Sequence, residues 1–144
     1  MKNKVLVFVY NKKTKKFLLF FNKPSFNQNG FTFNKEVNEK EDISKSIKSD
    51  FEQRFGLVIE EVFSLNWGSV YMQKGEEIKE MNYLIFVNSD KVSLTRENIS
   101  YEWLNIEDFI KKIHWNDKKV LEKVLTKAIN KEIYFNKKER EERI

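Results

Sequence analysis

The segment 35–57, KEVNEKEDISKSIKSDFEQRFGL, holds the side chains of this chain that are best suited to phosphate chemistry. Carboxylate oxygens are ligands that Mg²⁺ prefers, and acids that could assemble a metal site here are Glu39, Glu41, Asp42, Asp50 and Glu52. Lysine and arginine bind phosphate oxygens, and Lys35 and Arg54 lie near the two ends of the segment. The segment therefore combines groups for metal binding with groups for phosphate binding.

A helix must position most of these side chains. Apolar residues recur at four-residue spacing, which places them on one helical face: Ile43, Ile47 and Phe51. Asn38, followed three residues later by Glu41, has the pattern of a capping box and predicts the start of the helix. Gly56 can adopt the positive φ that ends many helices, so the helix is expected to stop there.

The spacing of the segment resembles the Nudix box, Gly-xxxxx-Glu-xxxxxxx-Arg-Glu-apolar-x-Glu-Glu-x-Gly-apolar, whose carboxylates hold the Mg²⁺ that hydrolyses a diphosphate linkage. The positions that match or nearly match are Glu41, Asp50, Phe51, Gly56 and Leu57. Asp42 takes the place of Glu41 if the preceding loop is one residue shorter. The positions that depart from the box are Lys35 for Gly, Ser49 for Arg, and Gln53 and Arg54 for the two late Glu residues.

The departures fall on the metal ligands. In a working box the carboxylates at i, i+3 and i+4 share one helical face, and the resemblance places Asp50, Gln53 and Arg54 there. Three negative charges are thus reduced to one negative and one positive charge. A unit charge pair about 4 Å apart interacts with roughly 4 kcal/mol at an effective dielectric constant of about 20, so an arginine strongly opposes a cation. The resemblance leaves Glu41 and Asp50 as weakened catalytic and metal-binding residues, and Mg²⁺ as a doubtful cofactor.

Arg54 has two interpretations. Its guanidinium could replace the metal by forking onto phosphate oxygens, with Lys35 as a second cation and Gln53 beside it. Alternatively, Arg54 points to solvent or pairs with Asp50 one helical turn earlier. The first interpretation predicts that a nucleotide or another phosphorylated ligand binds without being cleaved.

Two aromatic residues outside the box are further candidates. Trp67 and Tyr71 lie four positions apart in an expected strand, so their side chains point to the same side and either stack on a base or pack in the core. His114 is the only histidine and is expected to be a partly exposed turn residue rather than a general base. The chain contains no cysteine, which excludes disulfides and thiolate sites.

A second likeness covers residues 97–125, ENISYEWLNIEDFIKKIHWNDKKVLEKVL. It resembles the late segment of Nudix hydrolases that act on nucleoside triphosphates or dinucleoside polyphosphates. Two helices are expected in this region, with Asn105 and Asn116 as their N-terminal caps.

The order of elements predicts an α+β fold, a mixed β-sheet flanked by helices in the α/β/α sandwich of the Nudix fold. Strands are expected over 5–10, 17–21, 31–33, 57–72, 78–87 and 101–104. The two longest of these are expected in the centre of the sheet. Residues 1–130 are predicted to form a Nudix-like domain, and residues 131–144 a charged helical extension.

The net charge of +5 comes mostly from lysines that are scattered along the chain. Such scatter is typical of a solvated surface, although contact with RNA, or with a protein through the basic surface or the tail, stays possible. The apolar runs are far shorter than the roughly 18 to 20 residues that span a bilayer, so no membrane contact and a cytoplasmic location are expected.

These features together favour a Nudix-fold pseudoenzyme that binds a nucleotide or a protein partner without efficient pyrophosphate hydrolysis. Two alternatives remain. One is an active Mg²⁺-dependent hydrolase that cleaves a nucleoside diphosphate linked to another group, with Glu41 and Asp50 holding the metal in a non-standard way. The other is a small RNA-associated basic protein.

Overall fold

A computed structural model describes residues 2–23, 29–94 and 98–134. The described residues form, in chain order, β1 Lys2–Asn11, β2 Lys16–Asn22, β3 Phe33–Val37, α1 Ile43–Phe55, β4 Ile59–Gln73, β5 Glu76–Val87, β6 Ile99–Leu104, α2 Ile106–Lys112 and α3 Lys118–Ala128. The strands make one sheet in the order β4-β5-β1-β2-β6, and β3 also pairs with β1. Because β1 runs parallel to β5 and antiparallel to β2 and β3, the sheet is mixed.

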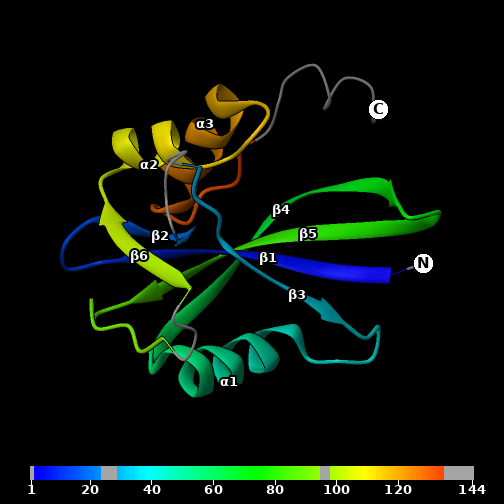
Figure 1. Ribbon diagram of the computed structural model, residues 1–144, viewed down its shortest axis with the longest axis horizontal. Coiled ribbons are helices and arrows are strands. Elements are labelled where there is room, and N and C mark those ends of the chain that lie inside the picture. The colour runs from blue at the N-terminus through cyan, green and yellow to red at the C-terminus, as the bar shows by residue number, and fades with distance from the viewer. Residues whose placement is uncertain (1, 24–28, 95–97, 135–144) are drawn as a thin grey trace.

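Helices cover both faces of this sheet (Figure 1). Helix α1 packs on one face, whereas α2 and α3 pack on the other. The predicted α+β class and its three-layer arrangement are therefore confirmed.

Strand β1 separates two hydrophobic cores. Successive side chains of a strand point to opposite faces. The even-numbered residues from Leu6 to Tyr10 lie in the cluster under α2 and α3, and the odd-numbered residues from Val5 to Val9 lie in the cluster under α1. None of them is more than 8% exposed. The strand predicted over 5–10 is thus confirmed, and its apolar run is buried on both faces of the sheet.

Strands β4 and β5 cover most of the strands predicted over 57–72 and 78–87, and they form a long hairpin. Its turn places Lys74 at φ 52° and Gly75 at φ 76°, the positive angles of a two-residue turn that matches the twist of the flanking strands. The expectation that both strands are central is wrong, because β4 lies at the edge of the sheet. Only β5 has the continuous apolar run that a central position needs, Leu84–Val87, whereas β4 is exposed over 68–73.

Helix α1 begins later than its expected capping box. Its N-cap is Asp42, whose carboxylate accepts a hydrogen bond from the backbone N–H of Lys45 at 3.2 Å. The pair Asn38 and Glu41 instead closes a turn ahead of the helix, in which the Glu41 N–H donates to the Asn38 carbonyl oxygen at 3.1 Å. Gly56 ends the helix at φ 67°, as predicted.

The two late helices have one confirmed cap and one corrected cap. Asn105 accepts a hydrogen bond from the Asp108 backbone N–H at 2.9 Å at the start of α2. The cap of α3 is Asp117 rather than Asn116, because the Asp117 carboxylate accepts from the free N–H of Val120 at 3.1 Å.

The remaining predictions concern the short strand at 31–33, the C-terminal extension and membrane-spanning helices. The short strand predicted at 31–33 begins at Phe33 as β3, and Phe31 makes only an isolated bridge to Phe20. Residues 131–134 form a turn and an irregular segment, and the rest of the predicted extension lies outside the described residues. No helix in the described ranges has the length and apolarity to cross a membrane.

Candidate functional site

A lysine lies between the two carboxylates that remain from the predicted metal site. Strand β3 carries Lys35, and its Nζ is 2.8 Å from Asp50 Oδ2 on α1 and 3.6 Å from Glu41 Oε2 in the preceding loop. The same ammonium donates a hydrogen bond to Ser46 Oγ at 2.6 Å. The Lys35 and Asp50 side chains are 17% and 22% exposed, so solvent screens this pair only in part.

The Asp50 carboxylate depends on this ammonium. Its Oδ2 is buried, and no hydrogen bond of good geometry reaches it from the described part of the chain. The positive charge of Lys35, 2.8 Å away, compensates the buried negative charge of Asp50. The two groups form an ion pair without a well-aligned hydrogen bond. One positive charge thus lies against two negative ones, in the place where the box resemblance expects a metal ion.

The pKa of the Glu41 carboxyl lies below its ordinary value of 4.5. The Ser46 hydroxyl contributes most, followed by the Asn38 backbone N–H and the charge of Lys35, because each favours the ionised form. Such a group stabilises the fold at pH values above 4.5, and its contribution disappears as the pH falls through the lower pKa of the folded state.

We therefore expect a Glu41→Gln variant to be less stable than the wild type near neutral pH, and the two proteins to converge in acid. Urea unfolding midpoints measured across the acidic range check this. Glu39→Gln, which removes one exposed carboxylate from the same loop, supplies the baseline. A stability gap between wild type and Glu41→Gln that persists unchanged in acid contradicts the prediction.

The side chains of Gln53 and Arg54, which replace the two late glutamates of the box, interact with other residues than Lys35 and Asp50. Gln53 Nε2 donates to Ser49 Oγ at 3.3 Å on the exposed side of α1. The Arg54 guanidinium lies 5.6 Å from the centre of the Phe33 ring, a distance at which the ring face attracts a cation. No ion pair joins Arg54 to Asp50 among the described residues, because Lys35 takes that carboxylate.

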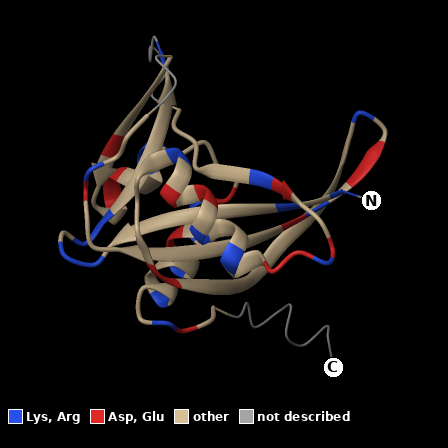
Figure 2. Cartoon of the chain, turned by 90° about the horizontal axis from the view of Figure 1, so that it is seen from below, with Lys and Arg blue, Asp and Glu red and all other residues tan. Residues whose placement is uncertain are grey.

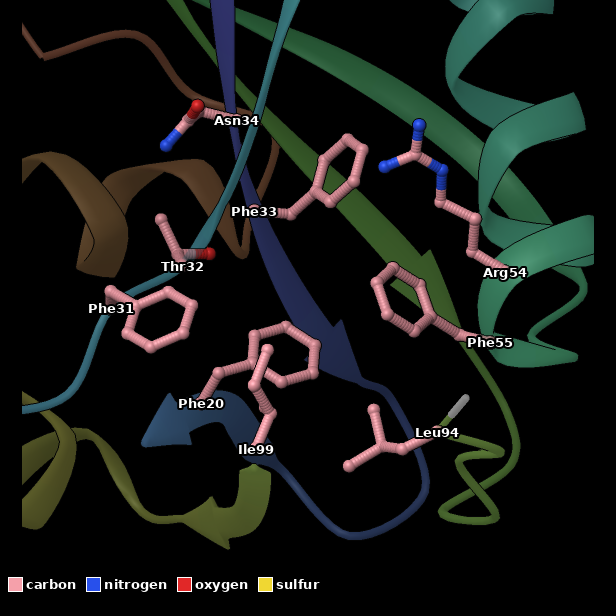
Figure 3. A pocket seen from close by; sticks show the side chains of 9 residues that line it. All are labelled: Phe20, Phe31, Thr32, Phe33, Asn34, Arg54, Phe55, Leu94 and Ile99. Carbon is pink, nitrogen blue, oxygen red and sulfur yellow. The ribbon is translucent and has the colours of Figure 1, made fainter. Parts of the chain in front are cut away.

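Arg54 borders a cavity of about 460 Å³ on the α1 face of the sheet. Figure 3 shows its side chain reaching from α1 toward Phe33, with Phe20 and Phe31 across the hollow. Six apolar side chains line the cavity: Phe20, Phe31, Phe33, Phe55, Leu94 and Ile99. An aromatic hollow with a guanidinium at its border can stack on a planar ring and bind an anion attached to it.

Trp67 and Tyr71 lie on the other face of the sheet. Trp67 packs against the core under α2 and α3, with its ring 5.7 Å from that of Trp115. The Tyr71 hydroxyl donates to Glu80 Oε2 at 3.1 Å, and burial, with the nearby Glu80 charge, raises the pKa of Tyr71. The structure thus brings Lys35, Glu41 and Asp50 together, and separates Trp67 and Tyr71 from Arg54.

No protein-family model and no curated protein matches this sequence, whereas solved structures match it over most of its length. A C. elegans Ap4A hydrolase in a binary complex aligns with a TM-score of 0.67 at 18% identity, over 90% of this chain and 98% of that one. The MutT protein of Methanosarcina mazei aligns with a TM-score of 0.62 at 16% identity, over 91% of this chain and 96% of that one. A Nudix-family hydrolase of Clostridium perfringens aligns with a TM-score of 0.62 at 14% identity, over 86% of this chain and 95% of that one. The chain has the Nudix fold. That confirms the fold expected from the box and the late segment, and leaves activity to be argued from the site.

The metal ion implied by the likeness to the Nudix box does not fit the residues of this Nudix-fold chain. Mg²⁺ prefers several oxygen ligands. The ammonium of Lys35 already pairs with Asp50 and Glu41, Gln53 is neutral, and Arg54 is itself a cation. Across residues 2–23, 29–94 and 98–134, no group of three or more Asp, Glu, His or Cys side chains is placed to hold a metal ion.

Proposed function

We propose that this Nudix-fold protein binds a phosphorylated aromatic ligand of the nucleotide class beside Arg54 and does not hydrolyse it efficiently. The observation that supports this most directly is the Lys35 ammonium, 2.8 Å from Asp50 and 3.6 Å from Glu41. A tethered cation neutralises these carboxylates and competes with Mg²⁺ for them. Without the metal, the attacking water lacks the activation that diphosphate hydrolysis needs.

The cavity beside Arg54 supports the binding half of the proposal. Phenylalanine faces offer stacking surface that is worth about 1–3 kcal/mol per base in nucleic-acid sites. Arg54 supplies a permanent positive charge and a planar set of donors for phosphate oxygens. The charge of Lys35 is taken up by its two carboxylates, so we assign the phosphate contact to Arg54 rather than to Lys35. Several proteins of similar fold are named for phosphorylated ligands, among them Ap4A hydrolase and a dihydroneopterin triphosphate pyrophosphohydrolase.

Calorimetric titration of nucleotides in the presence of EDTA tests the proposal. We expect binding without metal, weakened about tenfold to a hundredfold in Arg54→Ala, since a hydrogen bond to a charged group contributes about 1.5–3 kcal/mol. Lys48→Ala removes one positive charge from the exposed side of the same helix and serves as the matched control. We expect that control to bind within about twofold of the wild type.

Hydrolysis is the competing outcome. Release of phosphate or nucleoside monophosphate that depends on Mg²⁺ and is lost in Asp50→Asn would support the active hydrolase instead. Binding that requires a metal, or that is unchanged in Arg54→Ala, would also sink the proposal.

Association with RNA or a protein through the basic surface stays a weaker proposal. Figure 2 shows acidic and basic residues interspersed over the α1 side of the molecule, without one extended basic stripe. Nucleic-acid binding by scattered lysines weakens steeply with salt because counterions are released. Copurifying RNA and a steep salt dependence would favour this role over the nucleotide site.

A further inference from the structure

A second cavity, of about 410 Å³, lies on the opposite face of the sheet from Arg54. It is bounded by the β4–β5 hairpin and by the loop that leads into α3. The lining residues that matter for its chemistry are Trp67, Glu80, Asn82, His114, Trp115 and Asp117. None of these side chains lines the cavity beside Arg54, so the two cavities are separate sites.

Asn82 leaves a polar atom without a partner in the wall of this cavity. The residue is only 3% exposed, and its Oδ1 atom is buried with no hydrogen bond from the described residues. Nearly all buried acceptors in folded proteins are paired, because an unpaired one costs about 1–3 kcal/mol. A ligand with an N–H donor would satisfy Asn82.

The remaining lining groups favour a donor that is also positively charged. Glu80 accepts one hydrogen bond from the Tyr71 hydroxyl and keeps its other oxygen for a ligand. Asp117 caps α3 through Oδ1 and adds a second negative charge. The ammonium of Lys118, the residue after Asp117, donates to the Lys111 carbonyl oxygen at 2.8 Å, and Lys4 on β1 lies opposite Glu80 in the parallel pairing. Two carboxylates in a chain of net charge +5 are a local reversal of its overall sign.

Two indole rings complete the set. The rings of Trp67 and Trp115 lie 5.7 Å apart at an angle of 41°, and tryptophan is the best aromatic partner for a cation. Both residues are partly buried, so a bound cation would lose much of its water and gain attraction to the ring faces.

We propose that this cavity binds a small organic cation of the guanidinium class. The planar cation stacks on an indole face, donates one N–H to the Glu80 oxygen that Tyr71 does not use, and reaches Asn82 Oδ1 with a further N–H. A guanidinium fits better than a simple ammonium because it combines a flat face with several donors in one plane. This site is independent of the proposed nucleotide site, since the sheet separates the two cavities.

Titration of free arginine against citrulline tests the proposal by calorimetry. Citrulline has the same length and the same end groups as arginine, but its neutral urea replaces the guanidinium. We expect arginine to bind at millimolar or lower concentration and citrulline to bind at least about tenfold more weakly. We also expect Glu80→Gln and Asn82→Leu to reduce arginine binding by about tenfold each, because each removes one acceptor.

Matched controls separate this site from general attraction to acidic surface. Glu77→Gln removes one exposed carboxylate from the same strand and should leave arginine binding unchanged. Arg54→Ala should also leave it unchanged, so that failure here and failure of the nucleotide site are distinguishable. Glu80→Gln keeps the test valid if the buried Asn82→Leu change unfolds the protein. Equal binding of arginine and citrulline, no binding of arginine, binding of adenosine in its place, or full affinity in Glu80→Gln would each overturn the proposal.

Discussion

A Phe51→Ala variant is expected to lose about 3–5 kcal/mol of its free energy of unfolding, the usual range for truncating a buried phenylalanine. Phe51 is 0% exposed and joins α1 to the sheet. Its ring lies 4.7 Å from Phe33 on β3 and 5.1 Å from Phe55 at the end of α1. Removing the ring leaves a void between the helix and the sheet that backbone relaxation fills only partly.

The loss should appear as a lower urea midpoint with an unchanged slope, which indicates altered stability rather than an altered unfolded state. Val58→Ala is the control, because Val58 is 68% exposed and its truncation should change stability by less than about 0.5 kcal/mol. Phe33 and Phe55 also line the cavity beside Arg54, so weaker ligand binding should accompany the loss in Phe51→Ala. Similar stability in the Phe51→Ala and Val58→Ala proteins would show that α1 is not anchored by this ring.

Replacement of Lys35 by methionine should have the second largest effect, a loss of about 1–3 kcal/mol. Breaking a fully buried ion pair costs about 3–5 kcal/mol because it leaves a charge uncompensated, and partial exposure reduces that figure here. The side chain that loses its partner is Asp50, whose Oδ2 is buried. Its desolvation is then no longer offset.

A double-mutant cycle measures this coupling. The Lys35→Met, Asp50→Leu protein should recover much of the lost stability, since neither charge remains. Lys12→Met is the matched control, because Lys12 pairs with Glu60 at 3.4 Å with both side chains well exposed. Mg²⁺ should stabilise Lys35→Met more than the wild type, because the ion could then occupy the space between Asp50 and Glu41. Additive effects in the cycle, or an equal Mg²⁺ response, would argue against Lys35 as the replacement for the metal.

Local patterns predicted the elements better than their boundaries or their neighbours. The apolar run of β1 and the four-residue apolar spacing on α1 both depend on residues near one another in sequence, and the strand and the helix predicted from them were confirmed. The start of α1 was predicted four residues too early, because Asn38 and Asp42 are equally good caps by type. Only the hydrogen bond from Lys45 distinguishes them.

The geometry of the candidate site depends on contacts between segments that are far apart in the sequence, which local patterns do not predict. Charge counting at the box placed Gln53 and Arg54 at the two late glutamate positions and offered Arg54, with Lys35 as a second cation, as one of two interpretations. It could not predict that the Lys35 ammonium pairs with Asp50, because that contact requires β3 to pair with β1 while α1 packs alongside. The phenylalanines around Arg54 could not be predicted as one site for the same reason. They come from β2, from the segment that precedes β3, from β3 itself and from α1, and nothing in their local spacing indicates that they line one cavity.

The parallel pairing of β1 with β5 also constrains the order of events during synthesis. Strand β1 leaves the ribosome well before β5, the strand that begins at residue 76 and carries its ten parallel partners. Closing such a long loop is slow, because its entropy is lost before the paired strands repay it. Until then the edge of β1 that pairs with β5 is open. The side chains of Leu6, Phe8 and Tyr10 are also uncovered, because α2 and α3 follow β5 in the chain. A nascent chain stalled before β5 should therefore be the species of this protein most prone to aggregate.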